Sequence, residues 1–200
     1  MDFTVGNLLP TQRDQILAGK GFFYSTAASG TNALAVAGTG SAPMLYNSKT
    51  SGVNVRILKI YFGMISGTDA EAYIYYGLAL NPVVTLGSTT YVAPVNALGS
   101  GAGNTSAIAQ GTDGGWAPIT VAIGAAPTMW RVSGMSLPGA SAANGIMQAC
   151  DNVDGSIIIR PGMAFFPYLS NAAGALVAAI SILAVEDPII VGQYQAGMGG

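Results

Sequence analysis

Residues 53–62 read VNVRILKIYF, and this stretch decides the fold class. Apolar residues alternate with polar ones from Val53 to Ile57, which is the two-residue period of a strand that buries one face. The turn-forming types Gly, Thr and Asp follow at residues 67–69. Residues 72–80 (AYIYYGLAL) are rich in the aromatic and branched residues that strands favour. We therefore expect residues 53–62 and 72–80 to pair as neighbouring antiparallel strands.

The same strand signals recur along the chain, separated by turn-forming residues. Strand composition is found at residues 22–26, 33–37, 118–123 and 128–132. Residues 156–163 (SIIIRPGM) predict a strand that enters a tight Pro-Gly turn. In the final apolar run, residues 175–185, one face would be lined by Leu176, Ala178, Ile180, Ile182 and Ala184. Many short strands between turns indicate an all-β protein, a sandwich or a barrel, and of the two we expect an antiparallel β-sandwich.

The two ends and the middle of the chain differ from this pattern. Residues 1–21 predict an extended arm with about two turns of helix, since TQRD at residues 11–14 resembles a capping box. We expect the sandwich to span residues 22–187 and an apolar tail to occupy residues 188–200. Gly, Ser, Thr, Ala and Asn dominate residues 87–115, which predicts a long loop that is either functional or disordered, for example an exposed loop that orders only on assembly.

The chain carries little charge: only 8% of its 200 residues are charged, against about 25% in an average soluble domain. Seven basic and nine acidic residues give a net charge of −2, without the clustered Lys and Arg that nucleic acids require. The most apolar run, residues 172–185, is shorter than the about 20 residues of a membrane-spanning helix. We therefore expect neither a nucleic acid nor a membrane as partner, and a surface covered by other subunits.

The sequence lacks most residues on which catalysis and metal binding depend. It contains no histidine and a single cysteine, which excludes Ser-His-Asp and Cys-His arrangements, thiolate zinc sites and an intrachain disulfide. Cys150 stands beside Asp151, whose charge would raise its pKa, so we interpret it as a structural thiol. Residues 151–155 are interpreted as a turn rather than a calcium loop. We expect no enzyme, no cofactor, and no catalytic, cofactor-binding or metal-ligating residue.

Two stretches resemble small jelly-roll proteins of tailed-bacteriophage virions. MLYN at residues 44–47, followed by GVNVRILK at residues 52–59, is similar to their first core strands. The run IIIRPGMA at residues 157–164, with a final strand ending at Val185-Glu186, is similar to their end. These proteins decorate or cement the capsid. The resemblance implies a jelly-roll fold, a place in the virion capsid after assembly in the host cytoplasm, and two partners: the major capsid protein and copies of the chain itself, as a dimer or trimer.

Such a protein would act mechanically, by burying apolar area against its neighbours. The contacts expected from the sequence are Leu8, Leu9, Ile16 and Leu17 in the N-terminal arm, Trp130, and Ile189, Ile190, Val191 and Tyr194 in the tail. The alternative for the N-terminal helix is that it caps the end of its own domain.

Three other functions remain open from the sequence. A receptor- or glycan-binding module of a tail fibre or spike would need a pocket of aromatic and acidic residues, for which Tyr73, Tyr75 and Tyr91 are candidates. A hydrolase on a β-sandwich would need two carboxylates about 5–10 Å apart. A major shell-forming subunit would explain the sparse charge equally well.

Overall fold

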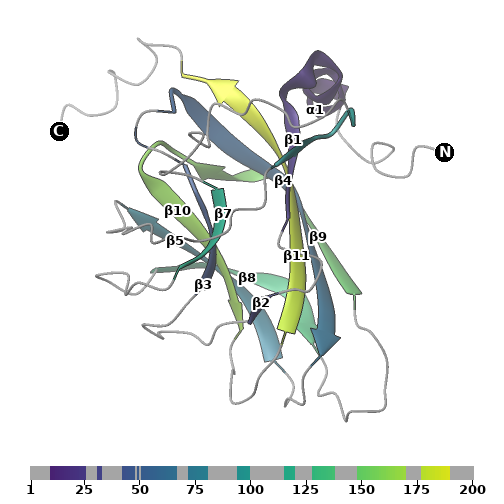
Figure 1. The fold of residues 1–200 in the computed structure, drawn as a ribbon, viewed down its shortest axis with the longest axis vertical. Helices are drawn as coiled ribbons and strands as arrows, with labels where there is room; N and C mark the ends of the chain where they lie inside the picture. The colour runs from purple at the N-terminus through teal and green to yellow at the C-terminus, as the bar shows by residue number, and fades with distance from the viewer. Residues whose placement is uncertain are drawn as a thin grey trace.

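The structure, a computed structural model, describes residues 10–25, 31–32, 42–47, 49, 51–66, 72–80, 94–99, 115–119, 128–137, 148–169 and 177–189. These residues form two antiparallel sheets packed face to face, with one short helix near the N-terminal end (Figure 1). The expected all-β sandwich with a short N-terminal helix is thereby confirmed.

Each sheet contains five strands in a continuous hydrogen-bonded order. The order in the first sheet is β6 (Val95–Asn96), β1 (Gly21–Ser25), β11 (Val177–Pro188), β4 (Val53–Ser66) and β9 (Gln148–Ile159). A short strand, β2 (Thr31–Asn32), also pairs with β11. The order in the second sheet is β7 (Gly115–Ile119), β3 (Ala42–Tyr46), β10 (Met163–Leu169), β5 (Ala72–Leu80) and β8 (Thr128–Leu137).

The long strands pair as nested partners, the first with the last and so on inward. β1 pairs with β11, β3 with β10, β4 with β9 and β5 with β8, so the chain resembles one long hairpin rolled into two sheets. This is the double-sheet arrangement of a jelly roll. The expectation that residues 53–62 and 72–80 pair with each other is wrong, because β4 and β5 lie in different sheets. Alternation identifies a strand with one buried face, but it does not identify the strand's neighbour.

The core lies between the sheets, and alternate residues of each strand enter it. Val55 and Ile57 of β4 face the core, and after a register shift at Leu58 the core residues become Ile60 and Phe62. Leu58 is an extra residue relative to β11, a β-bulge that exchanges the two faces of the strand. In β11 the predicted core face is confirmed at Ala178, Ile180, Ile182 and Ala184.

Several boundaries expected from the sequence need correction. Strand β11 continues to Pro188, and the backbone N–H of Ile189 donates to the Gly52 carbonyl at 3.0 Å, so the sandwich extends beyond residue 187. Part of the expected loop at residues 87–115 is strand β6, which pairs with β1. Residues 151–155 form no separate turn but a bulged stretch inside β9, where Asp154 and Gly155 have positive φ. The Pro-Gly turn at residues 160–163 is confirmed, with Gly162 at φ 81°.

The N-terminal helix consists of α1 (Pro10–Gln15) and a π-helical turn, η1 (Ile16–Lys20). The helix begins at Pro10, whose fixed φ suits the first helical position. Thr11 therefore lies inside the helix, and the predicted capping box is wrong. Gly19 has a non-helical φ of 76° inside η1, and this kink turns the chain toward β1.

Candidate subunit interface

The side chain of Ile16 packs the N-terminal helix against the outer face of the first sheet, which is the face turned away from the core. Its side chain is only 3% exposed and packs in a small cluster with Leu58, Leu183 and Val185. It also lies directly over β1, since a Cβ added to Gly21 would come within 2.7 Å of its side chain. The helix thus caps its own domain, and the expectation that Ile16 contacts another subunit is corrected.

A ring of three polar side chains also joins this helix to the first sheet. Arg56 Nε on β4 donates to Asp187 Oδ2 on β11 at 2.9 Å, as an ion pair. Arg56 Nη2 donates to Gln15 Oε1 at 2.6 Å, and Gln15 Nε2 donates to Asp187 Oδ1 at 2.9 Å. Because each member binds the other two, the helix is fixed in orientation as well as in position.

The edge strand β6 and the turn after it lie against the end of the helix. Asn96 Nδ2 donates to the Gly19 carbonyl at 2.9 Å, and the N–H of Ala97 donates to the Gly21 carbonyl at 2.9 Å. The N–H of Leu98 is taken by Asn96 Oδ1 at 2.9 Å. These bonds place residues 95–98 beside η1, although about 80 residues separate them in the sequence.

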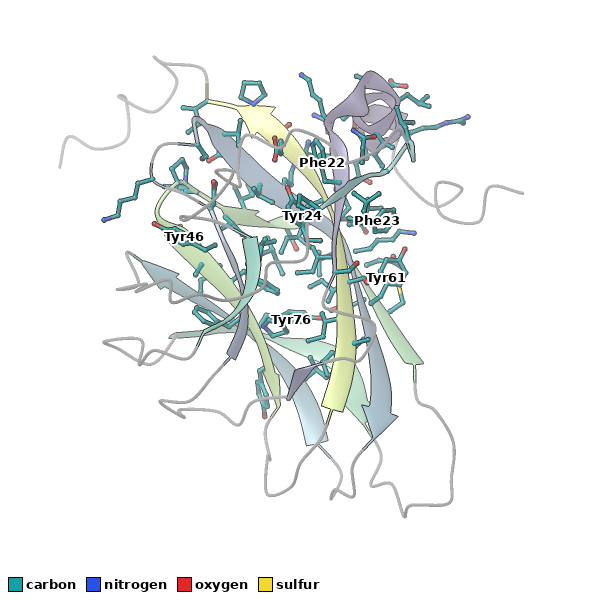
Figure 2. The ribbon with its side chains drawn as sticks, viewed as in Figure 1. Phe22, Phe23, Tyr24, Tyr46, Tyr61 and Tyr76 are labelled. Atoms are coloured by element: carbon teal, nitrogen blue, oxygen red, sulfur yellow. The ribbon has the colours of Figure 1, made fainter. Side chains whose placement is uncertain are left out.

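This corner of the molecule exposes apolar side chains. Of the four large hydrophobic side chains that are exposed among the described residues, three lie here: Leu17 (58%), Val95 (50%) and Leu98 (48%). Phe23, Tyr61 and Ala97 are half-buried and rest on the cluster beneath Ile16. Figure 2 shows Phe23 and Tyr61 on the outer side of the first sheet, below the helix. We name these six residues (Leu17, Phe23, Tyr61, Val95, Ala97 and Leu98) the corner patch.

Single exposed hydrophobic side chains are ordinary, but adjoining ones on neighbouring elements are typical of contact surfaces. The corner patch spans η1, β6, β1 and β4, all held in place by the bonds described above. It is therefore a preformed apolar surface, and it is the feature of the described residues best suited to binding another protein.

Three of the predicted contact residues besides Ile16 have a described position: Leu17, Ile189 and the backbone of Trp130. Leu17 belongs to the patch. Ile189 is half-buried, and its backbone N–H donates to the Gly52 carbonyl at 3.0 Å. The backbone of Trp130 lies in β8. The side chain of Trp130, and residues Leu8, Leu9, Ile190, Val191 and Tyr194, lie outside the described part of the structure.

The sequence does not predict the other five residues of the patch as surface residues: Phe23, Tyr61, Val95, Ala97 and Leu98. The one local signal was PVNAL at residues 94–98, an apolar run inside an otherwise Gly- and Ser-rich segment. Phe23 and Tyr61 lie in strands, where period-2 patterning shows two faces without showing which face is covered.

Two titratable side chains with raised pKa values occupy paired positions at the patch, Tyr61 on β4 and Cys150 on β9. Partial burial raises the pKa of the Cys150 thiol; Lys59 opposes this effect and Asp151 adds to it. The expected upward effect of Asp151 is therefore present, although burial is the larger cause. Burial and the facing Cys150 raise the pKa of Tyr61 in turn. A thiol of raised pKa stays protonated and weakly nucleophilic near neutral pH.

The buried or half-buried carboxylates between the sheets each bind a tyrosine. Tyr24 Oη donates to Glu186 Oε1 at 3.2 Å, and Tyr76 Oη donates to Asp151 Oδ2 at 3.1 Å. In the first sheet, Asp151 of β9 is the register partner of Ile60 of β4, and Ile60 is in turn the partner of Ile182 of β11. Glu186 lies four residues after Ile182 on the same strand. The two acids are thus about 13 Å apart along the strands, too far for a glycosidase pair.

Within the ranges that the structure describes, no three His, Cys, Asp or Glu side chains gather closely enough to hold a metal ion. The helical segment in those ranges is too short and too polar to cross a membrane. Of the candidate sugar-binding tyrosines, Tyr75 is half-buried on β5, and the side chains of Tyr73 and Tyr91 lie outside the described residues.

Comparison with known proteins found no match: no family model, no curated protein and no solved structure is significantly similar to this chain.

Proposed function

We propose that this chain is a structural, non-catalytic subunit of a virion that binds the capsid shell and stabilises it, as a decoration or cement protein does. The observation that carries the proposal is the corner patch, a preformed apolar surface on a chain with 8% charged residues. Adjoining exposed apolar side chains are unfavourable on a protein that stays monomeric in solution, whereas a subunit of a larger assembly buries them against its neighbours.

The physical basis of this function is the burial of apolar area at joints between subunits. Covering Leu17, Val95 and Leu98, each about half exposed, would contribute roughly 1 kcal/mol per side chain. A few kcal/mol per copy is modest for one contact. Repeated over every position of a shell, it resists the loss of any one subunit.

The ends of the described chain favour a second set of contacts. The helix that begins at Pro10 and the strand that ends at Pro188 are joined by the bond between Gln15 and Asp187. Both therefore lie at the same end of the sandwich (Figure 1). We expect the segments that continue from them, with Leu8, Leu9, Ile190, Val191 and Tyr194, to contact the major capsid protein.

The test is co-expression with the major capsid protein of the same virus, followed by sedimentation of the assembled particles. The full chain should sediment with the particles and raise the temperature at which they release their contents. Removal of residues 190–200 should weaken this binding, whereas the charge change Lys49→Glu, in the turn after β3, should not. A full chain that stays in the supernatant at every concentration would refute the proposal.

A further inference from the structure

We infer that the partner seated on the corner patch presents one carboxylate, an Asp or Glu side chain among apolar residues, to the ammonium group of Lys59. The inference rests on the proposed function, in which the patch contacts the capsid shell, and it names the chemistry of that contact.

Lys59 lies beside the corner patch on the outer face of the first sheet. Lys59 of β4 is the register partner of Leu183 of β11, and Leu183 is the partner of Phe23 of β1. Paired residues of antiparallel strands share a face, so these three side chains form one row across the sheet. Tyr61 follows Lys59 by two residues on β4 and points to the same face. A surface broad enough to cover Phe23 and Tyr61 (Figure 2) therefore reaches Lys59.

The charge of Lys59 is not neutralised within the described part of the chain. The residue is only 6% exposed, yet among the residues that the structure describes its ammonium group has neither an ion pair nor a hydrogen bond. Asp187, an acid on the same face, is held by Arg56 and Gln15. The Cys150 thiol has a raised pKa despite the nearby Lys59, so it stays protonated near neutral pH and supplies no negative charge.

A partner that covers the patch must deal with this cation. It removes the remaining water from the ammonium group, and a charge taken out of water costs free energy unless it is paired. A purely apolar partner would therefore bind poorly, whereas a carboxylate among apolar residues matches both the patch and the cation.

The number of basic groups favours a single carboxylate over a polyanion. Arg56, the neighbouring cation on this face, is already paired with Asp187. Nucleic acids and anionic membranes are bound by several clustered Lys and Arg residues. Lys59 offers one positive charge, which one Asp or Glu side chain neutralises.

The first experiment measures the sedimentation of the purified full chain with assembled particles, for three substitutions at Lys59. Lys59→Met keeps a long apolar stem but removes the charge, and it should weaken binding about tenfold or more. Lys59→Glu should weaken binding further, and Lys59→Arg, which keeps the charge, should stay within about threefold of the wild type. Lys49→Met, at an exposed lysine in the turn after β3, is the matched control and should bind like the wild type.

Urea unfolding of the free variants checks the fold. Lys59→Met should be at least as stable as the wild type, because it removes a nearly buried charge that has no described partner.

The second experiment needs no variant. A carbodiimide activates a carboxylate, and an amine in contact with it then forms an amide while the carbodiimide leaves as a urea. Applied to wild-type chain bound to particles, it should join Lys59 Nζ to an Asp or Glu of the major capsid protein, and mass spectrometry of the linked peptides identifies both residues.

Binding of Lys59→Met as tight as that of the wild type would overturn the inference and leave the proposed function standing. A cross-link from Lys59 to a second copy of this chain would do the same, as would cross-links from Lys20 or Lys49 to the shell protein with none from Lys59. A wild type that never sediments with particles refutes the proposed function itself.

Discussion

Alanine substitutions at Ile16 and Leu17 should separate the two roles of the N-terminal helix. The residues are adjacent and both apolar, yet Ile16 is 3% exposed and Leu17 is 58% exposed. Ile16→Ala removes three carbon atoms from the cluster with Leu58, Leu183 and Val185. At about 0.8 kcal/mol per buried carbon group, plus a term for the cavity left behind, the free energy of unfolding should fall by about 3 kcal/mol.

Leu17→Ala should change the free energy of unfolding of a single copy by less than about 0.5 kcal/mol, because the side chain is largely in water. Its effect should appear instead in binding to the partner that covers the corner patch, because it removes an exposed apolar side chain of that patch. Leu17→Ala should therefore weaken sedimentation with capsid particles while the unfolding free energy stays nearly unchanged, whereas the loss caused by Ile16→Ala should be the same at every protein concentration.

The assay is urea unfolding followed by far-UV circular dichroism at a high and a low protein concentration. Amide hydrogen exchange in residues 11–18 provides the control for a helix that detaches without global unfolding. Equal losses for the two variants would refute the reasoning. So would an Ile16→Ala protein with unchanged stability and a fully protected helix, since Ile16 would then not hold the helix on the sheet.

Three further results are expected. Asn47→Ala should lower the free energy of unfolding by about 2–4 kcal/mol in urea denaturation, because the amide donates to two buried main-chain carbonyls at 2.8 Å; a loss near zero would contradict this. Asp187→Asn should cost about 1 kcal/mol through its ion pair with Arg56, and the loss should shrink in about 1 M salt. Alkylation of Cys150 should accelerate with pH beyond the range of an ordinary thiol, and Asp151→Asn, which removes a charge that raises this pKa, should speed the reaction near about pH 8; slower alkylation would argue against it.

The sequence predicted the strands far better than their neighbours. Alternation along β4 and β11 located strands with one buried face, and the core residues of β11 followed from it directly. Alternation is a local property, because successive side chains of any strand point to opposite faces. Strand β4 pairs with β9 and β11 rather than with β5. This choice depends on how all the strands are divided between the two sheets that enclose the core, and no single stretch of sequence contains that information.

The candidate interface was only partly predictable for a similar reason. The helix was expected from its composition, and Leu17 was expected as a contact. Ile16 was grouped with it because both residues are apolar and adjacent. Only packing against Leu58 and Leu183 shows that one is covered and the other is not. Val95 lies in a segment whose composition predicts a loop. The segment is a strand because it pairs with β1, and this pairing is not visible in the local sequence.

By itself, the sequence determined that the protein is built from short strands, carries sparse charge and lacks the histidine that Ser-His-Asp and Cys-His catalysis require. These properties follow from composition and from two-residue periodicity, which every stretch of chain carries within itself. Only the tertiary structure decided the nested jelly-roll order and the corner patch. Both arise from contacts between residues far apart in the chain, and exposure is a property of what covers a side chain rather than of the side chain.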